Sequence, residues 1–339
     1  MTVLVTGGTG FLGRALVQRL VASGEERIRV LVRPWRDVPW LEALRREAPD
    51  RVEPFAGDLD SLDAAATALA GVRTVHHLAA AKSGAAAEVF AGTLGTSRHL
   101  LDAMLAMGTR PRVVLASSFG VQGTAELPPG TRVDETTPLE PHPARRDAYS
   151  HAKLEQERMF RDAHARRGLP LTVLRPGVVY GPGQAAPSQR IGFGPRAGLF
   201  FLFGGRNRLP LTHVDNCAEA FRFAAAHARF DGDTYDIVDE APPACRDYLR
   251  RYRAAHGGFL IVPVPWFATL AAAHANQALH RLSRDRVPKL LTPYRARTAW
   301  LPRTYSGDAL RALGYRQPIN TTEALDDALR TRPSSDSGG

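Results

Sequence analysis

The stretch Val3-Leu4-Val5-Thr6-Gly7-Gly8-Thr9-Gly10-Phe11-Leu12-Gly13 decides the fold of this chain. An apolar run leads into glycines spaced three apart, and a helical pattern begins directly after them. Gly7 allows a tight turn, Gly10 lets the backbone approach a pyrophosphate, and Gly13 lets the helix pack close to the strand. The free N–H groups of that helix favour a negatively charged ligand. We expect a dinucleotide-binding loop with contacts from Gly7, Thr9, Gly10, Phe11, Leu12 and Gly13.

Short apolar runs and longer amphipathic segments alternate from this stretch onward. The expected strands are 2–6, 28–32, 52–56, 74–77, 113–116 and 171–174, and the expected helices are 11–21, 61–69, 90–107 and 149–167. Strands rich in β-branched residues that alternate with helices are typical of a parallel sheet covered on both faces. We predict an α/β fold with a Rossmann-type, doubly wound parallel sheet and a smaller C-terminal substrate lobe.

Proline and glycine mark the expected boundaries. The segment 119–147 contains five prolines and little periodicity, so we interpret it as a loop over the active site. We assign residues 1–180 to a nucleotide-binding domain and residues 181–332 mainly to the substrate lobe, with some segments returning to the sheet. Residues 333–339 have the composition of a disordered tail.

The composition is that of a globular protein with an excess of positive charge. The chain has 339 residues, a net charge of +10 and only three lysines among its 44 cations. Because the arginines are spread along the chain, we expect no nucleic-acid partner. Two cysteines, Cys217 and Cys245, cannot build a disulfide framework, so a reducing cytoplasmic location is expected.

The longest apolar stretch, residues 259–273, is shorter than the roughly 20 residues that a membrane span needs, and it contains Pro263 and Pro265. We interpret it as a buried lobe helix preceded by a turn, with peripheral membrane contact as the alternative. No signal-peptide pattern precedes Val3. We expect no membrane span and no metal site.

Tyr149 and Lys153 form a pair at i and i+4 at the start of an expected helix. This spacing places both side chains on one helix face. A tyrosine with a pKa near 10 is a poor base at neutral pH, and a nearby ammonium stabilises the phenolate and lowers that pKa. The pair could therefore move a proton to or from a carbonyl or hydroxyl group.

These motifs resemble the extended branch of the short-chain dehydrogenase/reductase superfamily, the NAD-dependent epimerase/dehydratase family. The run Ser117-Ser118-Phe119-Gly120-Val121-Gln122-Gly123 is similar to the family's strand-end serine motif and implies that Ser118 orients the substrate oxygen. The resemblance implies catalysis by Ser118, Tyr149 and Lys153, with Tyr149 and Lys153 also on the cofactor side. It implies further cofactor contacts at Asp58, Leu59, Leu78, Ala79, Ala80, Lys82, Pro176 and Val178. The match extends from residue 2 to about residue 225.

The residues that follow the second strand bear on cofactor choice. Enzymes that prefer NAD usually carry an acid there, on the ribose 2′-hydroxyl. Here the position is Arg33, and Arg36 follows three residues later. Guanidinium groups suit a 2′-phosphate, so we expect NADP(H) to be favoured over NAD(H).

Three departures from the family pattern bear on substrate. Sugar-nucleotide enzymes of this branch carry an asparagine where this chain has Pro176-Gly177, and often an arginine near the position of Leu209. Gly92 stands where the family often has asparagine. The chain is therefore closest in motif to 3β-hydroxysteroid dehydrogenase and dihydroflavonol reductase-like members. Asp215 is interpreted as a structural helix cap.

We conclude from the sequence that the chain is an NAD(P)-dependent oxidoreductase that interconverts a carbonyl and a secondary alcohol of a small molecule. One alternative is a sugar-nucleotide epimerase or dehydratase that recycles its NAD internally. A remote alternative is a non-catalytic regulator that senses the cofactor. The resemblance also implies a homodimer formed through the helices at about 90–107 and 149–167.

Overall fold

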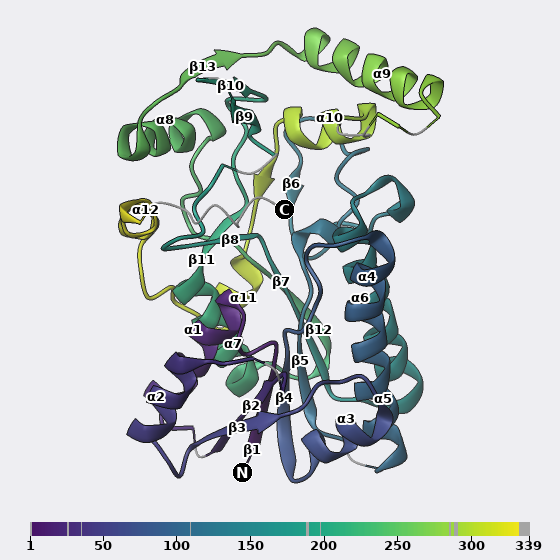
Figure 1. Cartoon of the computed structure of the whole chain (residues 1–339), viewed down its shortest axis with the longest axis vertical. Helices are drawn as coiled ribbons and strands as arrows, with labels where there is room; N and C mark the ends of the chain where they lie inside the picture. The colour runs from purple at the N-terminus through teal and green to yellow at the C-terminus, as the bar shows by residue number, and fades with distance from the viewer. Residues whose placement is uncertain are drawn as a thin grey trace.

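The computed structural model of the chain describes residues 2–25, 27–34, 36–108, 110–187, 190–196, 198–284, 286–287 and 291–331. The expected tail, residues 333–339, lies outside the described residues. The molecule is elongated, with a body built on a large sheet and a smaller lobe at the opposite end of its long axis (Figure 1).

The body contains a seven-stranded sheet in the order β12-β7-β5-β4-β1-β2-β3. Every pair of neighbouring strands is parallel. The predicted Rossmann-type α/β fold is confirmed, and the six predicted strands start and end within two residues of the observed ones. The strands are β1 (Thr2–Thr6), β2 (Arg27–Val32), β3 (Val52–Ala56), β4 (Val72–His77), β5 (Arg112–Ala116), β7 (Leu171–Pro176) and β12 (Asp231–Ile237).

Helices cover both faces of this sheet because its strands carry apolar side chains on both sides. One face packs against α1 (Phe11–Ala22), α2 (Pro39–Glu47) and α7 (Val214–His227). The other packs against α3 (Leu62–Leu69), α5 (Thr96–Ala106) and α6 (Ala148–Arg167). Figure 1 shows the two helical layers on opposite sides of the strands. The carboxyl ends of the strands point toward the lobe.

The helix expected over 90–107 starts earlier and contains an irregular turn. It consists of α4 (Ala86–Phe90), a π-helical turn η1 (Ala91–Gly95) and α5. Gly92 lies in the π-helical turn, and a Cβ atom there would approach the Cβ of Ala81 to 2.9 Å. An asparagine at this position would therefore collide with the loop after β4, which explains the departure from the family pattern.

Residues 119–147 form a long connection, as predicted, with only short elements. These are η2 (Phe119–Val121), β6 (Arg132–Val133) and η3 (Pro143–Arg145). The strand β6 pairs in parallel with β14 (Thr304–Tyr305), so this connection is tied to a segment near the end of the chain.

The lobe is built from small sheets and helices around a core of its own. The strand β8 (Val178–Tyr180) pairs with β11 (Leu211–His213) beside the body. A three-stranded sheet in the order β13-β10-β9 lies further out. Its strands are β9 (Gly192–Arg196), β10 (Leu199–Leu202) and β13 (Leu260–Pro263), and the helices of the lobe are α8 (Cys245–His256), α9 (Trp266–Leu282), α10 (Pro293–Trp300) and α12 (Thr321–Arg330). The helix α11 (Asp308–Ala312) packs on β12 instead, with Leu310 in the core of the body.

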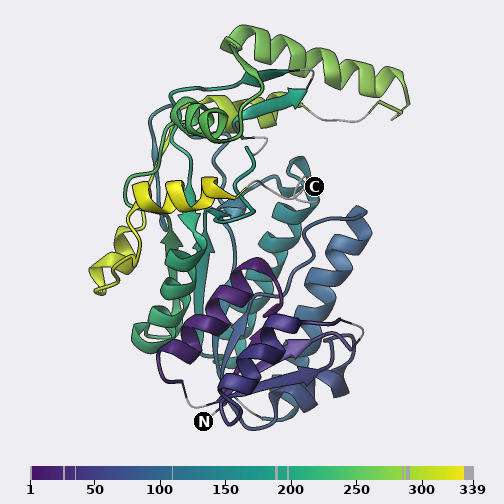
Figure 2. The same ribbon diagram turned by 60° about the vertical axis from the view of Figure 1, so that its left-hand side comes forward.

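The helix α9 corrects one prediction. The apolar stretch was expected to form a buried helix, but only Thr269 and Ala273 of α9 are buried, and the Phe267 side chain is 74% exposed. The reason is its position, because α9 lies at the outer end of the lobe with α10 on its inner side (Figure 2). Among the described residues, no helix combines the length and apolar character needed to cross a membrane.

Candidate active site

The glycine loop between β1 and α1 has the geometry that the sequence predicts. Gly7 has φ of +68°, and its carbonyl accepts a 3.0 Å hydrogen bond from the Gly10 N–H. A Cβ atom at Gly13 would lie 2.2 Å from the Gly7 carbonyl oxygen, so helix and loop touch backbone to backbone. Gly10 is the N-cap of α1 and offers no side chain to the free N–H groups. The loop therefore presents an open cradle of N–H donors.

The ends of β2, β3 and β4 bring the other predicted cofactor residues to the same edge of the sheet. Arg33 and Arg36 are exposed after β2. Asp58 follows β3; burial is the main cause that raises the pKa of its carboxyl group, and the charge of Arg33 acts in the opposite direction. The loop after β4 lies against the glycine turn, because a Cβ atom at Gly7 would lie 2.8 Å from the Ala79 nitrogen. The remaining predicted residues at this edge are Leu59, Leu78 and Ala80.

The predicted catalytic residues meet at the carboxyl end of β5. Ser118 is the N-cap of η2, and its Oγ accepts a 3.0 Å hydrogen bond from the Gly120 N–H. The Lys153 Nζ donates to the Ala116 carbonyl oxygen at 2.7 Å. A Cβ atom at Gly120 would lie 2.7 Å from the Ser150 Oγ, so the first turn of α6, which carries Tyr149, packs on the Ser118 loop.

The electrostatics of this pair differ from the prediction. Burial and the Asp147 carboxylate raise the pKa of Tyr149 to about 12. Burial and the Lys82 ammonium lower the pKa of Lys153 to about 7, with Glu157 acting in the opposite direction. The Lys153 ammonium is directed to the Ala116 carbonyl oxygen and into a buried polar network.

This buried polar network was not predicted. The Lys153 Nζ donates to the Gln156 Oε1 at 2.9 Å, and the Gln156 Nε2 donates to the Ser97 Oγ at 2.7 Å. Ser97 lies 2.9 Å from the His77 Nε2, and the His77 Nδ1 lies 2.8 Å from the Thr6 Oγ1. Burial lowers the pKa of His77 to about 3, so its ring is neutral at pH 7. The network connects the lysine to the strand before the glycine loop.

A second buried cluster holds α6 against the sheet. Glu157 accepts hydrogen bonds from Arg175 through Nε at 3.1 Å and Nη2 at 2.7 Å, and from the Ser117 hydroxyl at 2.5 Å. Arg161 adds a 2.9 Å bond to the same carboxylate. Glu157 lies one helical turn beyond Lys153. The cluster therefore joins the lysine-bearing helix to the ends of β5 and β7.

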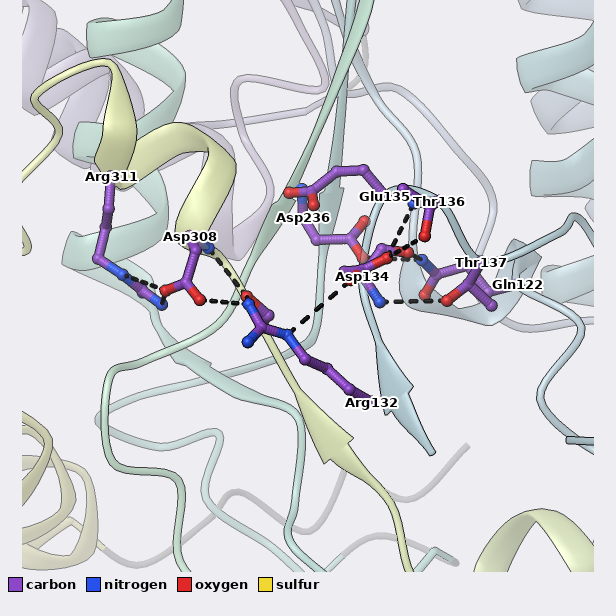
Figure 3. Close-up of polar contacts among 10 residues, drawn as sticks. Gln122, Arg132, Asp134, Glu135, Thr136, Thr137, Asp236, Asp308 and Arg311 are labelled. Carbon is purple, nitrogen blue, oxygen red and sulfur yellow. Dashed lines mark hydrogen bonds and ion pairs between the residues drawn. The ribbon is translucent and has the colours of Figure 1, made fainter. Parts of the chain in front are cut away.

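A third polar cluster anchors the connection 119–147 (Figure 3). The Gln122 Nε2 donates to the Asp236 Oδ2 at 2.7 Å and to the Asp134 carbonyl oxygen at 2.8 Å. Arg132 forms an ion pair with Asp308, which also accepts from Arg311 at 2.5 Å. Burial is the main cause that raises the pKa of Asp236 to about 8. These contacts fix the segment that starts at Ser118.

The segment after β7 contains Pro176 and Val178, both predicted to contact the cofactor. Gly177 between them has no room for a side chain, because a Cβ atom would lie 2.1 Å from the Pro210 carbonyl oxygen. Lys82 is exposed and acts electrostatically on Lys153. The predicted strand-end residues thus gather around one edge of the sheet, where ligands bind in folds of this topology.

The prediction that Asp215 caps a helix is wrong. The N-cap of α7 is His213, and Asp215 lies in the first helical turn. The buried Asp239 carboxylate satisfies this helix start, since it accepts from the His213 N–H and from the Asn216 side chain. It also accepts a 2.8 Å hydrogen bond from the Tyr180 hydroxyl. A cap assigned from sequence alone can be off by two residues.

Comparison with known proteins agrees with this geometry. A family model described as "NAD dependent epimerase/dehydratase family" matches residues 3–237. The 4-hydroxy-2-methyl-3-oxo-4-farnesyl-3,4-dihydroquinoline-1-oxide ketoreductase of Stigmatella aurantiaca is 29% identical over 98% of this chain and 97% of its own length. The 2-alkyl-3-oxoalkanoate reductase of Stenotrophomonas maltophilia is 31% identical over 96% of this chain and 97% of its own length. A 3 beta-hydroxysteroid dehydrogenase/Delta 5-->4-isomerase of Mycobacterium tuberculosis is 28% identical, over 96% and 89%.

Solved structures share the fold at lower identity. The UDP-glucose 4-epimerase of Bifidobacterium longum, solved with NAD+ and UDP, superposes with a TM-score of 0.69 at 18% identity, covering 97% of each chain. The family model spans more than half of the chain, and a relative more than 30% identical is covered almost completely. The chain therefore belongs to the NAD dependent epimerase/dehydratase family, the extended branch of the short-chain dehydrogenases/reductases, and is an NAD(P)-dependent oxidoreductase.

Proposed function

We propose that this oxidoreductase uses NADP(H) to interconvert a carbonyl and a secondary alcohol on an apolar small molecule. Tyr149 is the general acid or base, Ser118 orients the substrate oxygen, and Lys153 positions the cofactor ribose. The observation that carries the proposal is the contact between α6 and the end of β5, made by Lys153 on Ala116 and by Ser150 against Gly120. It supports an arrangement in which the tyrosine and the serine act on one oxygen atom.

The chain's residues fit a dinucleotide. Side chains at Gly7 or Gly13 would fill the cradle between β1, α1 and the loop after β4. The N-terminus of α1 carries no acidic residue in its first turn, so it presents unopposed positive potential to a pyrophosphate. When bound, the nicotinamide supplies or accepts the hydride. The chain's own contribution is to hold that ring near Pro176 and Val178 and to handle the proton.

The proton is handled at the Tyr149 hydroxyl. In the reduction direction the phenol donates its proton to the oxygen formed from the carbonyl, and in the oxidation direction the phenolate removes it from the alcohol. A pKa of about 12 keeps the tyrosine protonated at neutral pH, which favours its role as an acid in reduction. Ser118 would donate a hydrogen bond to the same substrate oxygen and stabilise the charge that develops there.

The NADP(H) preference rests on Arg33 and Arg36. Both are exposed at the end of β2, where no carboxylate occupies the position that would bind a ribose 2′-hydroxyl. The test is titration of the purified protein with NADPH and NADH. We expect tighter binding of NADPH, and Arg33→Ala should weaken NADPH by about tenfold (~1.4 kcal/mol) without affecting NADH. Arg46→Ala, an exposed arginine on α2, serves as the matched control. Equal losses for both cofactors would refute the 2′-phosphate role.

The apolar carbonyl substrate is inferred from the relatives and from the local geometry. The names of three relatives specify reduction of oxo compounds or oxidation of hydroxysteroids. The asparagine of sugar-nucleotide enzymes has no room at Gly177, and Leu209 is buried where such enzymes often carry an arginine. NADPH-dependent turnover of 3-oxo acids or 3-oxosteroids supports this proposal. Retention of NAD through purification together with turnover of a nucleotide sugar would replace it with the epimerase alternative.

We also propose a homodimer in the cytoplasm. Leu105 at the end of α5 is exposed and lines a surface hollow of about 540 Å³ between α5 and α6, and the nearby Met107 is also exposed. Both cysteines are buried and unpaired, which suits a reducing compartment. Light scattering after size exclusion tests the dimer, and a monomer at micromolar concentration would refute it.

A further inference from the structure

The outer face of α9 is exposed and mainly apolar, with His274 and Arg281 along one edge. It comprises Phe267, Ala271, Ala275, Ala278, Leu279 and Leu282, which recur at intervals of three or four residues and are all exposed. The large side chains among them are 74% (Phe267), 51% (Leu279) and 82% (Leu282) exposed. Soluble proteins rarely leave a continuous helix face of this composition in water, and such patches mark interaction sites.

A second apolar surface lies on the strand that leads into α9. Leu260 and Val262 of β13 are exposed and alternate along the strand, so they share one face of the outer sheet. Phe201 of β10 is also exposed and is the register partner of Val262. The outer end of the lobe therefore exposes large apolar side chains on two consecutive elements.

The charge of the chain is concentrated in the same part of the sequence. Residues 244–303 contain ten arginines and one lysine but only two carboxylates, Asp247 and Asp285, which gives a net charge of +9 against +10 for the whole chain. No Asp or Glu occurs from residue 248 to residue 284. Arg281, Arg284 and Arg286 are exposed at and just beyond the end of α9. The arginines are thus spread along the chain, but the excess of arginines over carboxylates is concentrated in residues 244–303.

The position of α9 suits a flat surface. It lies transverse to the long axis, at the end of the molecule furthest from the first strand, in both views (Figures 1 and 2). With 17 residues it is about 25 Å long, too short to span a bilayer but typical of a helix that lies in the interface. Arginines beside an apolar face can extend their charged ends toward lipid headgroups.

We propose that the outer end of the lobe docks on an anionic lipid surface, with the apolar face of α9 inserted at the headgroup boundary. A basic surface is attracted to an anionic bilayer through each arginine that approaches it, and the apolar face adds the burial of Phe267, Leu279 and Leu282. A nucleic acid would neutralise the positive charge but would leave these apolar side chains exposed to water. A second copy of the chain would cover them, but a two-fold interface would bring two segments 244–303, each of net charge +9, together. The proposal is independent of the substrate proposed above.

The test is sedimentation of the full chain with vesicles of phosphatidylcholine alone or mixed with phosphatidylglycerol. We expect binding to the mixed vesicles that is at least about tenfold stronger and that weakens when salt is raised from about 0.1 M to 1 M. The double variant Phe267→Ser/Leu282→Ser should lose most of this binding while keeping its unfolding curve and its turnover of a water-soluble substrate.

The matched control replaces two exposed leucines that lie outside the outer end of the lobe. Leu62→Ser/Leu313→Ser changes two side chains that are also exposed, on α3 and after α11, and should bind vesicles like the wild type. The proposal is overturned if the wild type ignores anionic vesicles, or if the two double variants bind them equally. It is also overturned if Phe267→Ser/Leu282→Ser dissociates an oligomer of the wild type in solution, since the face would then be covered by a second copy.

Discussion

Two long helices, α6 and α9, use their faces in opposite ways. The outer face of α6 carries Arg158 and Asp162, each in an ion pair with a neighbour on the same helix. Its inner face buries Lys153, Glu157 and Phe160 against the sheet. The helix α9 has no carboxylate at all, and its outer face is mainly apolar. The helix α6 buries its predicted functional residues against the sheet, whereas α9 exposes its apolar residues to solvent.

This difference has an energetic basis. Buried charges are tolerated only where hydrogen bonds and opposite charges surround them. The lysine of α6 meets this condition through Ala116 and Gln156, and the glutamate through Arg175, Arg161 and Ser117. The helix α9 contributes little to the core, so folding does not explain its apolar residues. The comparison predicts that substitutions on the inner face of α6 affect chemistry and stability, and that substitutions on the outer face of α9 affect neither.

The largest effect is expected from Tyr149→Phe, which removes the hydroxyl that handles the proton. Loss of a general acid or base lowers the rate by about 10²–10⁴-fold. We expect kcat to fall by this factor while the Kd for NADPH stays the same, measured by stopped-flow kinetics and fluorescence titration. Tyr252→Phe on α8 is the matched lobe variant and should retain wild-type turnover. Comparable losses in the two variants would contradict the assignment.

Glu157→Gln should have the next largest effect, on stability. It leaves Arg175 buried without its charged partner, which costs about 3–5 kcal/mol of unfolding free energy. Glu155→Gln removes a part-exposed pair with Arg158 and a longer contact with His151, and should cost at most about 1 kcal/mol. Denaturant unfolding of the two variants gives the comparison. Similar small losses would show that the cluster does not hold α6.

The same pair of variants predicts a pH dependence. Burial alone would raise the pKa of Glu157, but the hydrogen bonds and charges of Arg175 and Arg161 outweigh it and lower this pKa. A depressed carboxyl pKa contributes stability above the unfolded pKa, about 4.3, and this contribution is lost as the pH falls through the folded value. The stability gap between the wild type and Glu157→Gln should therefore be constant near neutrality and shrink below about pH 4.

Gln156→Glu should have an intermediate effect, on the pH profile. Since the pKa of Lys153 is about 7, kcat/KM for NADPH should decline as the pH rises through that value. A carboxylate in place of the amide oxygen stabilises the ammonium, so the decline should move upward by about one pH unit, equivalent to ~1.4 kcal/mol. Gln18→Glu, on the exposed side of α1, adds the same charge elsewhere and should leave the profile unchanged. An unmoved profile in Gln156→Glu would mean that the amide does not tune the lysine.

Local patterns predict a large part of this molecule. The glycine spacing, the strand–helix alternation and the Tyr149–Lys153 spacing each lie within a few residues of sequence, and the observed strands follow them. The network around Gln156 does not follow from a local pattern. Its members Thr6, His77 and Ser97 come from separate segments that only the folded sheet brings together. No spacing rule identifies such a group.

The lobe shows a different limit. Periodicity identifies a helix and its apolar residues, but it cannot tell whether a core or the solvent lies beside them. The apolar stretch before Ala273 therefore predicted a buried helix that the structure exposes. The cap of α7 shows a smaller error, since His213 and Asp215 are both plausible partners for a helix start and only the buried Asp239 decides between them.

The smallest effect is expected from Phe267→Ala, and its size tests the comparison most directly. Truncation of Phe160, which is fully buried on the inner face of α6, should cost about 3–5 kcal/mol of unfolding free energy. Truncation of Phe267 removes the same atoms from an exposed position and should change that free energy by less than about 0.5 kcal/mol. If Phe267→Ala lowers the unfolding free energy nearly as much as Phe160→Ala, the Phe267 side chain must be buried against other residues, which contradicts its exposed position in this structure. An unfolding free energy equal to that of the wild type would show that the Phe267 side chain does not stabilise the fold, as its exposure predicts.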